Sequence, residues 1–211
     1  MNTRIKICGI TRIADAQAAV AAGADALGLN FAPTSPRWVD AAIAADISGA
    51  VAGAATRVGV FVDQGRAEIE QILASVPVDL LQFHGNETAE FCRSFSLPYM
   101  KAFRVGAPFD AAAAVAAYPD ACALLLDAYV PGVPGGTGET LALEYWPETA
   151  TLPLVLAGGL TAANVAAAIA AVELDAVDVA GGVESGTKGI KDHQKMNNFI
   201  AAVKAADRIS Q

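Results

Sequence analysis

Short apolar segments alternate with helical segments along the whole chain, and the alternation recurs eight times. The apolar segments are rich in β-branched residues and predict strands at Ile5–Gly9, Ala26–Phe31, Arg57–Val62, Leu80–His84, Met100–Val105, Ala123–Ala128, Leu154–Ala157 and Ala176–Ala180. Between them, apolar residues recur every three or four positions, which predicts helices near Ile13–Ala22, Ala41–Ala52, Arg66–Ser75, Thr88–Phe95, Ala111–Ala117, Leu141–Pro147, Ala163–Val172 and Lys191–Ile209. Strands that are apolar throughout are typical of a parallel sheet that is buried on both faces.

Two architectures fit this alternation, an open doubly wound sheet and a closed (β/α)8 TIM barrel. The count of eight favours the barrel because it leaves no segment over. The chain has 211 residues, which is compact against the roughly 250 of a typical barrel. No linker-like tract or block of charge divides the sequence. We therefore predict an α/β fold in which residues 1–211 form a single barrel domain.

Composition limits the partners of the chain. Lys and Arg total 14 against 22 Asp and Glu, and the resulting net charge of −8 argues against nucleic acid or an anionic membrane surface as a partner. The uncharged stretch Thr149–Val172 is long enough to span a membrane, but Pro153 and Gly158-Gly159 break it into shorter elements. Residues Met1–Cys8 contain no apolar signal core, and we expect a cytoplasmic protein.

The three cysteines are an odd number without a C-x-x-C motif, and the chain has only two histidines. This pattern predicts neither a disulfide framework nor a metal site. Cys92 on a predicted helix and Cys122 before a predicted strand are interpreted as packing residues. The sequence leaves open whether the protein is a monomer or a homodimer.

In a barrel of this type the active site lies at the carboxyl ends of the strands. The polar residues and glycines that occur at those ends are few. They are Cys8-Gly9, Asn30 with Ser35-Pro36-Arg37, Gln82 with His84-Gly85, Asp127 with the loop Gly135–Gly138, Gly158-Gly159, and Gly181–Glu184.

These residues give the chain a resemblance to the phosphoribosylanthranilate isomerase family that extends over nearly its whole length. The motifs that carry it are, in chain order, Lys6–Thr11, Phe31–Arg37, Leu81–Gly85, Leu125–Asp127, Gly135–Gly138, Leu156–Leu160, and Gly182–Glu184 with Lys191-Asp192. The resemblance implies a cofactor-free Amadori rearrangement of N-(5-phosphoribosyl)anthranilate to 1-(2-carboxyphenylamino)-1-deoxyribulose 5-phosphate in tryptophan biosynthesis. It also implies that Cys8 is the general base and Asp127 the general acid.

The chemistry of these residue types agrees with that reaction. An aldose-to-ketose isomerisation of an amino sugar needs one acid and one base on different sides of the substrate. The predicted strands that carry Cys8 and Asp127 lie on different arcs of the barrel. A free thiol has a pKa of about 8.5, so a cysteine that acts as a base needs help to ionise. We hypothesise that Lys6, on the same face of its strand, or Arg37 helps to hold the thiolate.

Two further side chains are candidates for substrate binding. A guanidinium at Arg37 suits the anthranilate carboxylate through bidentate pairing. His84 is open to two interpretations, a contact to substrate or packing at a strand end. Asp178 is likewise open, as a residue of the mouth or as a structural anchor.

Phosphate recognition is expected to depend on backbone N–H groups. Gly158, Gly159, Gly181 and Gly182 end the last two predicted strands and allow the chain to approach an anion closely, and we expect a helix N-terminus to assist after the last strand. Ala180-Gly181 stands where the family commonly has Ser-Ser, so hydroxyl contacts are lost there while N–H contacts remain. The loop Gly135–Gly138 is interpreted as a mobile segment that closes over the mouth.

Other functions need residues that the sequence does not offer. A related phosphosugar epimerase would need metal ligands at the strand ends, an aldolase a Schiff-base lysine, and the related histidine-pathway isomerase an aspartate in place of Cys8. Lys101 is the one candidate for a Schiff base, and we expect it to lie too deep. A non-catalytic phosphate-binding barrel should have lost the acid or the base, and both are present.

Overall fold

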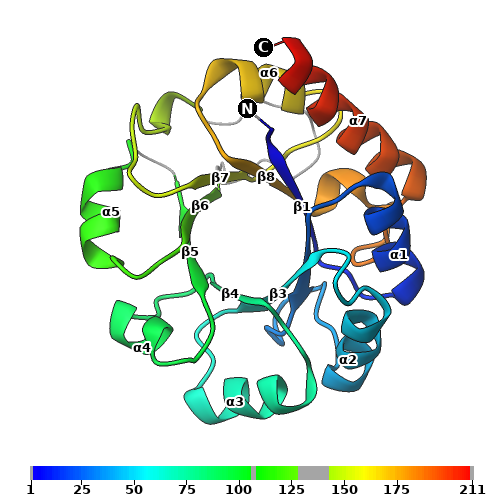
Figure 1. The fold of residues 1–211 in the computed structure, drawn as a ribbon, viewed down its shortest axis with the longest axis vertical. Coiled ribbons are helices and arrows are strands. Elements are labelled where there is room, and N and C mark those ends of the chain that lie inside the picture. The colour runs from blue at the N-terminus through cyan, green and yellow to red at the C-terminus, as the bar shows by residue number, and fades with distance from the viewer. Residues whose placement is uncertain (1, 106–107, 128–142, 210–211) are drawn as a thin grey trace.

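The structure is a computed structural model that describes residues 2–105, 108–127 and 143–209. The strands form a closed barrel in which each strand pairs in parallel with the next along the chain, and β8 pairs with β1. They are β1 (Arg4–Cys8), β2 (Ala26–Asn30), β3 (Thr56–Phe61), β4 (Leu80–Phe83), β5 (Tyr99–Arg104), β6 (Ala123–Asp127), β7 (Leu154–Ala157) and β8 (Ala176–Val179). This confirms the predicted (β/α)8 fold, and Figure 1 shows the helices arranged around the barrel wall.

Helices follow most strands and cover the outside of the barrel. They are α1 (Ile13–Ala22), α2 (Ala41–Ala50), α3 (Arg66–Ser75), α4 (Ala89–Arg93), α5 (Ala111–Ala117), α6 (Val165–Ala171) and α7 (His193–Ile209), with the 3-10 helices η1 (Leu143–Tyr145) and η2 (Gly181–Val183). Several begin at a side chain that accepts a backbone N–H, as Thr88 does for α4 and Asp110 for α5. No helix in the described ranges is both long enough and apolar enough to cross a membrane.

Two helix predictions need correction. The helix expected at Leu141–Pro147 is, in its described part, only the three-residue η1, and Pro147 disfavours helical geometry in the residue before it. Residues 141 and 142 lie outside the described ranges. The last helix starts at His193 rather than at Lys191, because Lys191 instead forms an antiparallel bridge with Glu184.

Alternation along the strands separates the core from the site. In β1, Ile5 and Ile7 are buried in the large apolar cluster between wall and helices, whereas Lys6 and Cys8 face the barrel interior. A second, smaller cluster fills the interior with Met100, Ala102, Ala123, Leu125, Val155 and Ala157. Because half of these side chains are alanine, the interior leaves room for polar groups and a cavity at the carboxyl ends of the strands.

Candidate active site

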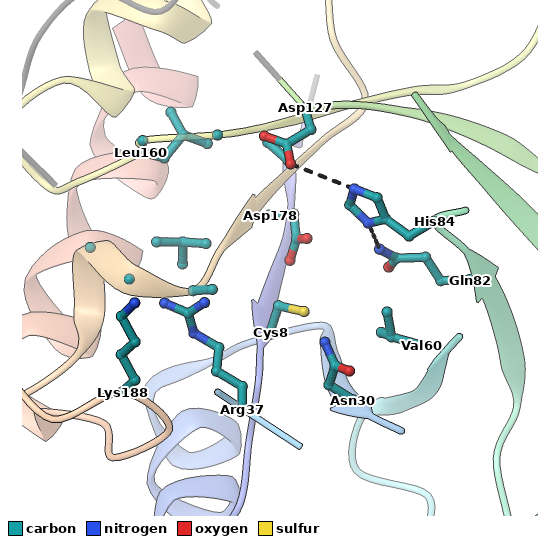
Figure 2. Close-up of a pocket in the computed structure, with 17 residues that line it drawn as sticks. Cys8, Asn30, Arg37, Val60, Gln82, His84, Asp127, Leu160, Asp178 and Lys188 are labelled. Carbon is teal, nitrogen blue, oxygen red and sulfur yellow. Dashed lines mark hydrogen bonds and ion pairs between the residues drawn. The ribbon is translucent and has the colours of Figure 1, made fainter. Parts of the chain in front are cut away.

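A cavity of about 380 Å³ opens at the carboxyl ends of the strands. Every residue predicted for the site lines it: Cys8, Arg37, His84, Asp127, Gly158, Gly159, Gly181 and Gly182. The cavity is also lined by polar residues that the sequence left without a definite role, namely Asn30, Gln82, Asp178 and Lys188. Figure 2 shows these side chains converging on the cavity from strands around the barrel and from the loops that follow them.

Cys8 ends β1, and its thiol faces the cavity. Burial raises the pKa of the Cys8 thiol, and the positive charges of Lys6 and Lys191 oppose this shift without cancelling it. This agrees in direction with the hypothesis that Lys6 helps to hold the thiolate, since a hydrogen bond from Lys6 also lowers the pKa of Cys8. The net effect is a raised pKa, so the Cys8 thiol is harder to ionise here than in water.

Lys6 and Asp178 form a buried ion pair close to Cys8. Lys6 Nζ lies 3.0 Å from Asp178 Oδ1, and both side chains are almost completely buried. Burial lowers the pKa of Lys6, but its attraction to Asp178 and to Cys8 outweighs burial and leaves that pKa raised. Asp178 therefore fits both interpretations, because it lines the cavity and also forms a hydrogen bond with Lys6.

Arg37 reaches the cavity from the loop after β2 and forms a bidentate ion pair with Glu184. Its Nε and Nη2 donate to the two carboxylate oxygens of Glu184 at 2.6 and 2.9 Å. Glu184 is fixed in turn by the backbone N–H of Gly189 at 2.9 Å and by Lys191 Nζ at 3.5 Å. Gly9 has a φ of 71°, and a Cβ there would overlap the Arg37 side chain. The glycine after Cys8 thus makes room for the arginine.

On the other side of the cavity, Asp127 at the end of β6 faces His84 after β4. Asp127 Oδ2 lies 3.5 Å from His84 Nε2, and Gln82 Nε2 lies 3.2 Å from His84 Nδ1 (Figure 2). With the Gln82 amide as donor, His84 Nδ1 is the acceptor, and the neutral ring carries its proton on Nε2, toward Asp127. In the barrel wall β7 and β8 separate Asp127 from Cys8, so the two groups approach the cavity from different arcs.

The glycine pairs after β7 and β8 line a third part of the cavity. Gly158 and Gly159 have φ values of 92° and 62°, which residues other than glycine rarely adopt. A Cβ on Gly182 would overlap the carbonyl oxygen of Leu160, so the absence of a side chain at Gly182 allows the two loops to approach closely. The helix N-terminus that directly follows β8 beside the cavity is that of the three-residue η2.

Other predictions have mixed outcomes. Cys92 is buried as expected, but Cys122 is exposed at the amino end of the barrel rather than packed. Lys101 is almost completely buried, as expected, but it lies on the outer face of β5 and pairs with Glu87. The loop Gly135–Gly138 lies outside the described residues. Within those residues, no group of three or more His, Cys, Asp or Glu side chains is placed to hold a metal ion.

The main residue that sequence reasoning left without a role is Glu184. It was part of a motif, but its partner Arg37 is 147 positions away in the chain. The available signal was its place two residues after the Gly181-Gly182 pair at a strand end, together with a cation on another loop of the same mouth.

Comparisons with known proteins agree with this geometry. A family model described as N-(5'phosphoribosyl)anthranilate (PRA) isomerase matches residues 5–202. The chain is 55% identical over 204 residues to an N-(5'-phosphoribosyl)anthranilate isomerase of Pseudomonas fluorescens, with 97% of each chain covered. The crystal structure of phosphoribosyl anthranilate isomerase from Thermotoga maritima matches with a TM-score of 0.86 and 37% identity, over 96% of this chain and 99% of that one.

A further solved structure is a phosphoribosyl anthranilate isomerase in complex with reduced 1-(o-carboxyphenylamino)-1-deoxyribulose 5-phosphate. It matches with a TM-score of 0.82 and 36% identity, and the match covers 96% of this chain and 99% of that one. Both the sequence match and the structural match therefore extend over nearly the whole length. The chain belongs to the family of N-(5'-phosphoribosyl)anthranilate isomerases.

Proposed function

We propose that this protein catalyses the Amadori rearrangement of N-(5'-phosphoribosyl)anthranilate to 1-(o-carboxyphenylamino)-1-deoxyribulose 5-phosphate in tryptophan biosynthesis. The observation that carries the proposal is one cavity lined by a thiol, a carboxyl group, a guanidinium and two glycine pairs, each from a different part of the barrel mouth. A substrate with an acidic ring, a reacting sugar and a phosphate needs these three kinds of contact. The family membership and the product-like ligand of the related structure support it.

The reaction is divided between Asp127 and Cys8. Asp127 delivers a proton to the ring oxygen of the ribose, and the ring opens to an iminium at C1. The Cys8 thiolate then removes the proton from C2, which the neighbouring iminium makes acidic, and an enolamine results. Tautomerisation of the enol to the ketone moves a proton from the C2 hydroxyl to C1, so substrate and product have the same composition. His84 beside Asp127 is placed to contact the sugar and to steer the acid.

Arg37 is assigned to the anthranilate carboxylate. Glu184 uses one N–H on Nε and one on Nη2, and a guanidinium carries five N–H groups. The N–H groups on the outer edge, on Nη1 and Nη2, remain as a fork for a second carboxylate. Lys188 and the glycines at 158–159 and 181–182 are assigned to the phosphate.

We place the reaction in the cytoplasm, because a thiol that acts as a base must stay reduced. The substrate is a small phosphorylated molecule, and a metal or organic cofactor is not needed for the two proton transfers.

The proposal is tested with purified protein and N-(5'-phosphoribosyl)anthranilate, by following the loss of anthranilate-type fluorescence. We expect turnover by the wild type and a loss of at least about 100-fold in kcat for Cys8→Ala and for Asp127→Asn, since each removes one of the two proton-transfer groups. An inactive wild type, or wild-type rates in both variants, would show that the assignment is wrong.

A further inference from the structure

On the outer side of the barrel wall, the buried ion pair between Lys101 and Glu87 forms hydrogen bonds with the backbone on both sides of His84. Lys101 lies on β5 and, unlike its neighbours Met100 and Ala102, is not part of the apolar cluster inside the barrel. Its Nζ donates to the carbonyl oxygens of Phe83 at 3.3 Å and Gly85 at 2.6 Å. These two carbonyl groups belong to the residues immediately before and after His84.

Glu87 completes the arrangement. One carboxylate oxygen, Oε2, pairs with Lys101 Nζ at 3.1 Å and accepts the backbone N–H of Gly85 at 2.9 Å. The other, Oε1, accepts the backbone N–H of Asp63 at 2.8 Å, which ties the loop after β3 to the loop after β4. The side chains of Lys101 and Glu87 are 2% and 3% exposed, so solvent hardly competes for these bonds. We call these two residues the clamp.

The place of the clamp is not explained by stability alone. Its lysine lies against the rings of Phe103 and Tyr118, at 5.8 and 5.7 Å from their centroids, where an apolar side chain would also pack. Burying an ion pair is often no more stabilising than burying apolar residues of similar size. What an apolar pair would not supply is hydrogen-bond partners for the backbone of Phe83 and Gly85, the residues on either side of His84, and for Asp63 on the neighbouring loop.

We propose that Lys101 and Glu87 are positioning residues that hold the His84 ring against Asp127. The inference rests on the proposed function, because it assigns His84 a role beside the acid. Fixing the backbone at Phe83 and Gly85 fixes the Cα of His84 from both sides, and Gln82 then sets the rotation of the ring. The contact between His84 Nε2 and Asp127 Oδ2, at 3.5 Å, depends on this placement.

The kinetic test removes the clamp with the double variant Lys101→Met/Glu87→Gln, because Lys101→Met alone would leave a buried carboxylate without its cation. We expect kcat to fall about tenfold, as a displaced group at an active site costs rate, while KM changes less than about twofold. In a His84→Ala background, the same double substitution should change kcat by less than about twofold. A tenfold loss in that background would overturn the proposal, since the clamp would then act without His84.

A second test needs no substrate. The chain has only two histidines, so the ring resonances of His84 and His193 are easily told apart by NMR. We expect the clamp variant to shift or broaden the His84 ring signals, while His193, which contacts Asp15 at 2.9 Å, keeps its signals. Unchanged His84 signals would overturn the positioning role even if the enzyme is active. If the wild type shows no isomerase activity but the clamp variant still shifts the His84 signals, the proposed function fails while the positioning role of the clamp stands.

The chain offers a matched control pair and a milder variant. Arg57→Met/Asp79→Asn removes an ion pair with hydrogen bonds of 2.6 and 2.8 Å at the amino end of the barrel, and it should leave kcat and the His84 signals unchanged. A tenfold loss in this control as well would count against any specific role of the clamp. Glu87→Gln alone keeps Lys101 and its two carbonyl contacts, and it should move both readouts in the same direction by a smaller amount.

Discussion

At the scale of single residues, the environment of Cys8 combines opposing effects. Burial raises the pKa of its thiol, whereas Lys6 and Lys191 lower it. The net effect is a thiol whose pKa lies above its ordinary value. In the proposed mechanism, the positive charge of the iminium intermediate would add to that of Lys6 and Lys191 and favour the thiolate.

Removing Lys6 should make Cys8 still harder to ionise. In Lys6→Met, the loss of the cation and the uncompensated charge of Asp178 both act to raise the pKa of the Cys8 thiol, so thiolate forms at higher pH than in the wild type. The measurement is the pH dependence of Cys8 alkylation by iodoacetamide in a Cys122→Ser background, because Cys122 is exposed. Lys204→Met, on the exposed face of α7, is the control and should leave the titration unchanged. A Cys8 midpoint that stays or falls in Lys6→Met would contradict the role of Lys6.

The positions of Cys8 and Asp127 in one cavity could be predicted from the sequence, because both follow apolar strand segments and both belong to motifs that resemble the family. The direction of the pKa shift of Cys8 could not be predicted from the sequence. Whether the charge of Lys6 outweighs the effect of burial depends on how completely the barrel interior excludes water, and that is a property of all the strands together.

At the scale of elements, the loops after β7 and β8 approach each other closely at Gly182. This contact depends on Gly182, whose missing Cβ leaves room for the carbonyl group of Leu160. Alternation and turn residues predicted where these strands end, but the short η2 was not predicted, because it depends on how Gly181 and Gly182 pack on the neighbouring loop. The outward direction of Lys101 likewise required the strand register, which the composition of β5 does not give.

Gly182→Ala should push the two loops apart. We expect a loss of about 1–3 kcal/mol in the free energy of unfolding, as for other overpacked sites, and a raised KM because the N–H groups assigned to the phosphate move. Urea denaturation and steady-state kinetics measure the two effects. The same change at Gly49, an exposed position in α2 with open space around it, should instead stabilise by up to about 1 kcal/mol. A Gly182→Ala protein with wild-type stability and KM would rule out this close contact.

At the scale of the whole molecule, the first and last elements are joined by buried carboxylates. Asp207 on α7 accepts the backbone N–H and the hydroxyl of Thr3 at 2.9 and 2.7 Å. Asp15 on α1 accepts from Arg12, from the backbone N–H of Lys191 at 3.1 Å and from His193 at 2.9 Å. The eightfold alternation was sufficient to predict the barrel, but these closing contacts join residues more than 170 positions apart and carry no local pattern.

Asp15→Asn should destabilise the protein in a pH-dependent way. Burial acts to raise the pKa of Asp15, but its bonds to Arg12, Lys191 and His193 outweigh burial and lower it. A carboxyl group with a lowered pKa stabilises the fold above its unfolded value of about 3.9 and loses that effect as the pH falls further. We expect Asp15→Asn to cost about 1–3 kcal/mol at pH 7 and progressively less below about pH 4.

Urea denaturation at several pH values checks this, with Asp46→Asn on the exposed side of α2 as the control. An Asp15→Asn effect that is equal at pH 7 and at pH 3 would show that the carboxylate charge does not matter.

The grip of Glu184 on Arg37 also bears on the entropy of ligand capture. An arginine side chain has about 2 kcal/mol of rotamer freedom, which a mobile residue at the mouth would lose when a ligand arrives. Here the two bonds to Glu184 restrain the guanidinium. Rotamer freedom is thus given up during folding, so a carboxylate that binds Arg37 as proposed would meet a partner whose orientation is already set.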